Sequence, residues 1–133
     1  MNLAQVIHQR WAAADALNDL LSGARVHTGL SVDPTPPYAV ISKLDQSPTS
    51  LHHDGSGVDE VTLRIQVYHD HYDQAAAIIQ QVKAAFDRTS FDLSGSDKVL
   101  FMRRTGDSEH QGEDGLWRLV VDFRCTVYLA SGI

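Results

Sequence analysis

The sequence contains one cysteine among its 133 residues, Cys125, so the chain cannot form an internal disulfide. It has no run of the roughly 20 apolar residues that span a membrane, and its first residues are not apolar enough for a signal peptide. Basic residues are also few, 11 Lys and Arg against 17 Asp and Glu, and the net charge of −6 argues against a general nucleic-acid-binding protein. We therefore expect a soluble protein of a reducing cytoplasm, without membrane contact.

The composition is that of one ordinary globular domain. Hydrophobic residues make up 43% of the chain and charged residues 21%, close to the average for folded proteins. The length fits a single domain over residues 1–133.

The most regular apolar pattern lies around residues 59–69. Every second position is apolar, the period of a strand with one buried face: Val61, Leu63, Ile65 and Val67. The apolar spacing then changes to three and four, which predicts an amphipathic helix up to about Arg88: Tyr72, Ala75, Ala76, Ile79, Val82 and Phe86. We expect the strand face and the helix stripe to bury each other.

A second helix is predicted at the start of the chain, over residues 2–22, with Asn2 as its N-cap and Gly23 at its C-terminal end. Trp11 lies on the apolar stripe of this helix, which favours core packing over the alternative, an anchor at a subunit contact. The remaining predicted strands are 24–28, 38–44, 98–103 and 116–129.

Two polar stretches are predicted as loops, Asp45–Val58 and Arg104–Gly115. We interpret the first as an exposed hairpin arm that is mobile in the free subunit and becomes ordered against a neighbour. The order of elements predicts an α+β fold, an antiparallel sheet with two helices packed on one face. Its inner face should include seven residues: Val61, Leu63, Ile65, Val67, Leu119, Val121 and Phe123.

Histidines are the first candidates for chemistry, in the pairs His52-His53 and His69/His71. A metal site needs three or four converging ligands, which a junction between strand and helix does not favour. The alternative is that Asp70 or Asp73 caps the helix and the histidines are solvated. The sequence leaves the role of all four histidines open.

Other reactive groups lack a motif around them. The acidic pairs Asp59-Glu60 and Glu113-Asp114 are placed in loops, where carboxylates usually serve solvation. Cys125 lies on an apolar strand face and is expected to be inert. The small-residue stretches resemble neither a nucleophile elbow nor a phosphate-binding loop: Gly55-Ser-Gly57 and Ser94-Gly-Ser96. Arg103-Arg104 is a solvated strand end or contacts an acidic neighbour. We assign no catalytic, cofactor-binding or metal-binding residue.

The layout resembles the tail completion, or tail terminator, proteins of long-tailed bacteriophages and prophages. The resemblance covers nearly the whole chain and is carried by several segments in order: Leu20–Val26, Pro36–Ile41, Val61–Tyr68, the helix-opening positions Asp70, Tyr72, Ala75 and Ala76, and Asp114–Tyr128. The polar stretches Asp45–Val58 and Arg104–Gly115 depart from the family pattern.

The resemblance implies a structural virion protein and no enzyme. Such proteins form a ring, usually a hexamer, at the head-proximal end of the tail, where the ring ends polymerisation of the tube and joins the tail to the head. The implied partners are the tail-tube protein and head-completion or connector proteins, with DNA crossing the lumen without specific binding and assembly in the host cytoplasm. The alternatives are a head-completion connector, a tail-tube-like protein, a small His-based metal-dependent enzyme and a ligand-binding module.

Overall fold

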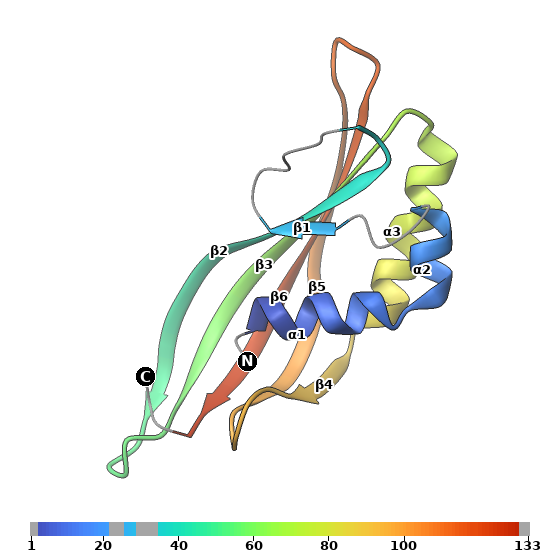
Figure 1. Cartoon of the computed structure of the whole chain (residues 1–133). Helices are drawn as coiled ribbons and strands as arrows, with labels where there is room; N and C mark the ends of the chain where they lie inside the picture. Colours follow the sequence, from blue (N-terminus) through green and yellow to red (C-terminus); the bar gives the residue numbers. More distant parts are fainter. Residues whose placement is uncertain (1–2, 22–25, 29–34, 131–133) are drawn as a thin grey trace.

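The computed structural model describes residues 3–21, 26–28 and 35–130. Figure 1 shows its helices and strands, in the order α1 (Leu3–Ala12), α2 (Asp15–Leu20), β1 (Val26–Thr28), β2 (Tyr38–Leu51), β3 (Gly57–His69), α3 (Tyr72–Phe86), β4 (Thr89–Asp92), β5 (Lys98–Gln111) and β6 (Trp117–Leu129). The predicted N-cap Asn2 and the residues around Gly23 lie outside the described residues.

The strands form one curled sheet in the order β1-β2-β3-β6-β5-β4. Neighbouring strands run antiparallel except at one edge, where the short strand β1 pairs with β2 in parallel. The prediction of a purely antiparallel sheet was therefore wrong, because periodicity gives the faces of a strand and not its direction.

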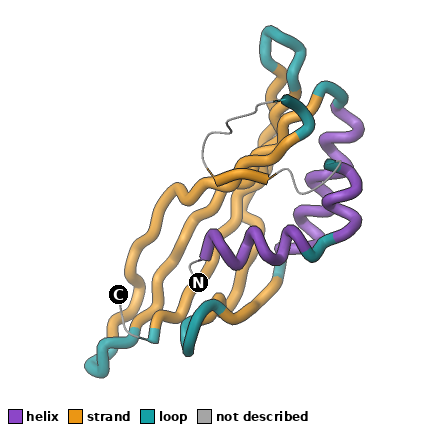
Figure 2. The backbone as a smooth tube through the Cα atoms, in the orientation of Figure 1, coloured by secondary structure: helices purple, strands orange, loops and turns teal. Residues whose placement is uncertain are grey.

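All three described helices lie on the same side of the sheet, which makes the two-layer α+β arrangement that the sequence predicts, with one helix more than predicted (Figure 2). Helix α3 packs on β3, β5 and β6, and α2 packs on α3. The seven residues predicted for the inner face are all buried: Val61, Leu63, Ile65, Val67, Leu119, Val121 and Phe123. The alternation in two strands thus predicted the core face correctly.

The predicted first helix is in fact two helices, because the chain turns at Ala14, whose φ of −91° and ψ of 86° are not helical. The Nδ2 group of Asn18 donates hydrogen bonds to the carbonyl oxygens of Trp11 and Ala12, both at 3.0 Å. Where α1 ends, the Trp11 carbonyl also accepts from the Ala14 N–H at 3.0 Å. The Asn18 side chain adds a second donor there and a donor for the Ala12 carbonyl, which stabilises the turn.

Both predicted loops are largely strand, and these predictions were wrong. Strand β2 continues to Leu51, and β5 continues to Gln111. Strand β2 pairs with β3, and β5 pairs with β6, almost up to the short turn that joins them. The predicted hairpin is therefore confirmed, whereas the predicted long loop is not. Backbone pairing needs no apolar side chains, and polar residues suit a strand that is exposed on both faces.

Substitution of Trp11 tests how much the stability of the fold depends on packing of the helices against the sheet. Its side chain is fully buried, and its ring centroid lies 6.1 Å from that of Phe86 in α3. Trp11→Ala should lower the free energy of unfolding by about 3–5 kcal/mol. Trp11→Phe should cost less, because the buried Nε1 group has no hydrogen-bond partner to lose among the described residues.

Urea denaturation followed by circular dichroism measures both effects. Leu20→Ala on the exposed side of α2 is the matched control and should change stability by less than about 0.5 kcal/mol. A Trp11→Ala variant as stable as the parent would show that Trp11 does not belong to the core.

Candidate assembly surfaces

Two hairpin turns of the same construction mark opposite ends of the sheet (Figure 1). In the β2–β3 turn, the Ser56 N–H donates to Asp54 Oδ1 at 3.0 Å, and Gly55 has a φ of 89°. In the β5–β6 turn, the Leu116 N–H donates to Asp114 Oδ1 at 3.0 Å, and Gly115 has a φ of 83°. Each Asp-Gly pair thus closes its strands over a few residues, since glycine accepts the left-handed conformation.

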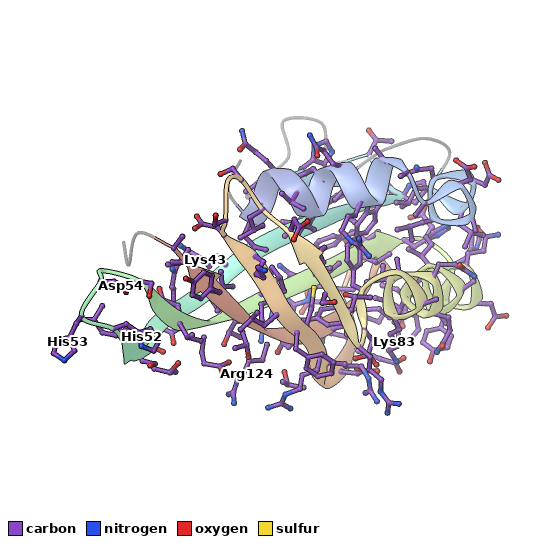
Figure 3. All side chains as sticks on the ribbon, turned by 90° about the horizontal axis from the view of Figure 1, so that it is seen from below. Lys43, His52, His53, Asp54, Lys83 and Arg124 are labelled. Carbon is purple, nitrogen blue, oxygen red and sulfur yellow. The ribbon has the colours of Figure 1, made fainter. Side chains whose placement is uncertain are left out.

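The four candidate histidines lie at two separate places. His52 and His53 occupy the exposed β2–β3 turn, where Figure 3 shows them at the tip with Asp54. His69 ends β3 and His71 precedes α3, near the other end of the same strand. Within the described part of the chain, no three His, Cys, Asp or Glu side chains are grouped to hold a metal ion. That protein purified without added metal contains no stoichiometric zinc stays a prediction from the sequence, which metal analysis of the purified protein would check.

His69 has a structural role that the sequence analysis missed. Its side chain is buried, and its Nδ1 atom accepts a hydrogen bond from the backbone N–H of His71 at 3.0 Å. The predicted cap by Asp70 or Asp73 was wrong, because His71 is the N-cap and no side chain caps the helix. Burial lowers the pKa of His69, and nearby His71 lowers it further.

The cysteine, serine and arginine side chains that the sequence offers for chemistry are buried or already have partners in the fold. Burial raises the pKa of the Cys125 thiol to about 12, so it stays protonated and unreactive at neutral pH. Ser56 is buried, and its hydroxyl donates to Asp54 Oδ1 at 2.6 Å. Arg104 forms an ion pair with Asp107 at 3.1 Å.

Asp59 and Glu60 lie within β3 rather than in a loop, which corrects the sequence prediction. Asp59 Oδ2 accepts from Gln46 at 2.8 Å, and Glu60 Oε1 accepts from the Thr126 hydroxyl at 3.1 Å. Both carboxylates thus serve cross-strand hydrogen bonds.

A groove of about 490 Å³ remains on the inner face of the sheet, near the start of α1. Most of its lining is apolar: Leu3, Ala4, Ile41, Val61, Leu63, Leu93, Val127 and Leu129. Its polar groups already have partners, since Lys43 donates to Gln46 at 3.0 Å and Asp97 accepts from the Ala130 N–H at 2.8 Å. The groove therefore offers no convergent polar set that would orient a small ligand.

The outer face of the sheet is not covered by any of the described helices and carries a network of charges. Arg64 makes two hydrogen bonds to the Asp122 carboxylate, at 2.9 and 3.1 Å. Arg124 lies 3.9 Å from Glu60 and points away from α1 (Figure 3). Arg103 stands directly opposite Arg124 and has no ion-pair partner among the described residues. Like charges in a cross-strand pair are unfavourable, so this face has a cation available for an outside partner.

The family model described as "Tail completion protein gp17" matches residues 5–128, which is nearly the whole chain. The chain belongs to this family of tail completion proteins. It is thus a structural protein of a phage tail, and the family resemblance that the sequence indicates is confirmed.

A solved structure supports the fold of this tail completion protein. A chain from "Virion of native gene transfer agent (GTA) particle" superimposes with a TM-score of 0.71 at 17% sequence identity, over 92% of each chain. Comparison with the curated proteins gives no match. No helix in the described ranges is long and apolar enough to cross a membrane.

The stability of the tail completion protein should depend on pH through His69. A histidine whose pKa is lowered on folding stabilises the protein above its unfolded pKa of about 6.5, and this contribution is lost as the pH falls. Protonation at Nδ1 would also remove the acceptor for the His71 N–H. We expect the midpoint of urea unfolding to fall between pH 7.5 and 5.5, and to fall less in His69→Asn, whose Oδ1 can accept the same bond.

His8 is the matched control, because burial lowers its pKa as well, with help from His27. His8→Asn should remove only its own part of the pH dependence. An unchanged pH dependence in His69→Asn would exclude His69 as the titrating group.

Proposed function

We propose that this tail completion protein forms a ring at the head-proximal end of the tail, ends polymerisation of the tail tube and joins the tail to the head. The match of the tail completion family to residues 5–128 carries this proposal. The likeness in fold to a chain of a gene transfer agent virion supports it.

The ring is proposed to be a hexamer built from identical head-to-tail contacts. Such contacts need two different patches on each copy. The sheet offers them, because β2 and β5, each only partly covered by the short edge strands β1 and β4, lie toward its two sides, and the hairpin turns lie at its two ends. The tail-tube protein and a head-completion or connector protein would then bind the two faces of the ring.

The charge of the chain fits a channel through which DNA moves. With a net charge of −6, a ring of several copies repels phosphate overall, which disfavours tight binding of the passing DNA. We place assembly of the ring in the cytoplasm of the bacterial host, before heads and tails join.

The β2–β3 hairpin is the proposed contact with a neighbouring protein. Leu51, next to its turn, is 75% exposed, the most exposed large hydrophobic side chain among the described residues. Gly57 begins the returning strand, and a Cβ there would lie 2.8 Å from the Ser50 carbonyl oxygen. A close-packed tip with an exposed leucine is suited to insertion into a partner surface.

Shortening this hairpin tests the proposal. Replacement of Pro48–Asp59 by Asn-Gly keeps Ser47 opposite Glu60 and closes the strands with a two-residue turn. The fold should survive, as measured by circular dichroism and thermal unfolding. Particles assembled with this variant should show overlong tubes or unattached tails under the electron microscope.

Leu20→Ser, an exposed change on α2, is the matched control and should give normal particles. The appearance of particles made with the shortened hairpin also distinguishes a tail terminator from the two alternative virion proteins. Tails of normal length without heads would favour a head-completion connector, and a complete lack of tails would favour a tail-tube-like protein. Normal infectious particles from the shortened-hairpin variant would show that tail assembly does not require the hairpin.

A further inference from the structure

Both edges of the sheet are only partly covered. At one edge β1 pairs with β2 only at Ala39–Ile41, and at the other β4 pairs with β5 only within Lys98–Met102. Ser42–Leu51 of β2 and Arg103–Gln111 of β5 therefore have no strand partner on their outer side within the described chain. Open edges of this length offer unpaired N–H and C=O groups to another strand, except at Arg104, whose N–H already donates to Asp87 Oδ1 at 2.8 Å, and at Pro48, which has no N–H.

The two open edges are complementary in direction. Each step from β2 through β3 and β6 to β5 is antiparallel, so β2 and β5 run in opposite directions. A second copy placed beside the first by rotation would therefore bring its β5 antiparallel to β2. The open part of β2 leads to the β2–β3 turn and that of β5 to the β5–β6 turn, at opposite ends of the sheet (Figure 1). Pairing these two segments requires the neighbouring copy to be displaced along the strand direction. Such a displacement between neighbouring strands also occurs in closed barrels, where it goes with the tilt of the strands.

We propose that the open edge of β2 in one copy pairs with the open edge of β5 in the next, so that the sheet continues around the ring. This rests on the proposed function, because it requires a ring. The partner is a second copy of this chain, since the two edges of one molecule complement each other in length, face and charge.

The lengths of the two edges agree. Shifts of register leave one residue unpaired in each bulge, Leu44 and Thr49 in β2 and Thr105 in β5. Ten residues less two on β2, and nine residues less one on β5, leave eight ladder positions on each edge. Strand β1 limits the overlap at one end and β4 of the neighbour limits it at the other.

The longest overlap that keeps inner faces with inner faces and reaches neither β1 nor β4 pairs seven of the eight positions, from Lys43 opposite Gln111 to Leu51 opposite Arg104. It places Asp45 opposite His110 on the outer face, and neither side chain has a partner in the described part of the chain. It also places Ser47 opposite Ser108. Opposite charges in cross-strand pairs stabilise a sheet, more so when the histidine is protonated.

The inner face carries a second complementary pair in the same register. Lys43 lies diagonal to Glu109 of the neighbour. Among the described residues, Lys43 donates only to the neutral Gln46, at 3.0 Å, and Glu109 accepts only from the Tyr72 hydroxyl, at 2.7 Å. Both charges are thus available to one another, and the β2 edge is matched in sign to the β5 edge on both faces.

A cysteine pair across the proposed contact tests the register. In Ser47→Cys/Ser108→Cys, the new thiols on adjacent copies would be close enough for a disulfide. Mild oxidation of the concentrated protein should give a ladder of covalent oligomers on non-reducing gels. The buried Cys125 should add no background.

The matched controls are the two single variants and Ser47→Cys/Ser96→Cys, which places the second thiol in the exposed β4–β5 connection. The single variants should stop at the dimer, and the Ser96 pair should give no ladder beyond it. A ladder of equal strength from the Ser96 pair would overturn the register.

Charge exchange tests the same contact without crosslinking. Asp45→Lys and His110→Asp should each raise the concentration for half-assembly by about two- to fivefold, and together they should restore it. Native mass spectrometry and sedimentation measure the assembly. Rings that form without the predicted ladder would overturn the edge pairing and leave the proposed function intact. A chain that stays monomeric at every concentration and gives no ladder would overturn both.

Discussion

The pairing of β3 with β6 is the interaction on which the rest of the structure depends. It runs without a bulge from Gly57 opposite Leu129 to His69 opposite Trp117. These two strands supply most of the inner face on which the helices pack, and most of the outer face with its arginine–carboxylate network. Because side chains alternate strictly along both strands, a slip of one residue would exchange the apolar core for the charged face. The register is therefore fixed by the cost of burying Arg64 and Asp122.

The same strands explain which parts of the fold could be predicted from the sequence. Alternation in β3 and β6 and the helical stripe of α3 are strong local signals, and they identified the core face. The extents of β2 and β5 were not identified, because their outer halves carry polar side chains on both faces. The signal that could have found them is the pair of Asp-Gly steps at 54–55 and 114–115, which mark tight turns between long strands. The break between α1 and α2 depends on the contacts of Asn18, which no local pattern shows.

For the candidate site, the absence of catalytic and metal-binding residues stays a prediction from the sequence. The structure separates the histidine pairs to different ends of β3. The sequence analysis did not show that His69 is buried and accepts a bond from the chain at the start of α3. It also could not show that β1 and β4 each cover only part of an edge. That feature depends on how far each pairing extends, which is a property of the whole sheet and not of any one segment.

The uninterrupted pairing of β3 and β6 also sets a length. Thirteen residues in each strand, at about 3.3 Å per residue, extend over about 43 Å, and the compact turns add little to this. Insertion of one residue inside either strand would turn every side chain beyond it to the other face, unless a bulge absorbs it, as at Leu44 in β2. The length is therefore changed most simply at the turns, by about 3.3 Å for each residue added to a strand. In the proposed ring, the thickness of the layer that one copy adds would thus change only in discrete steps. Proteins that stack on this layer would have to match one of them.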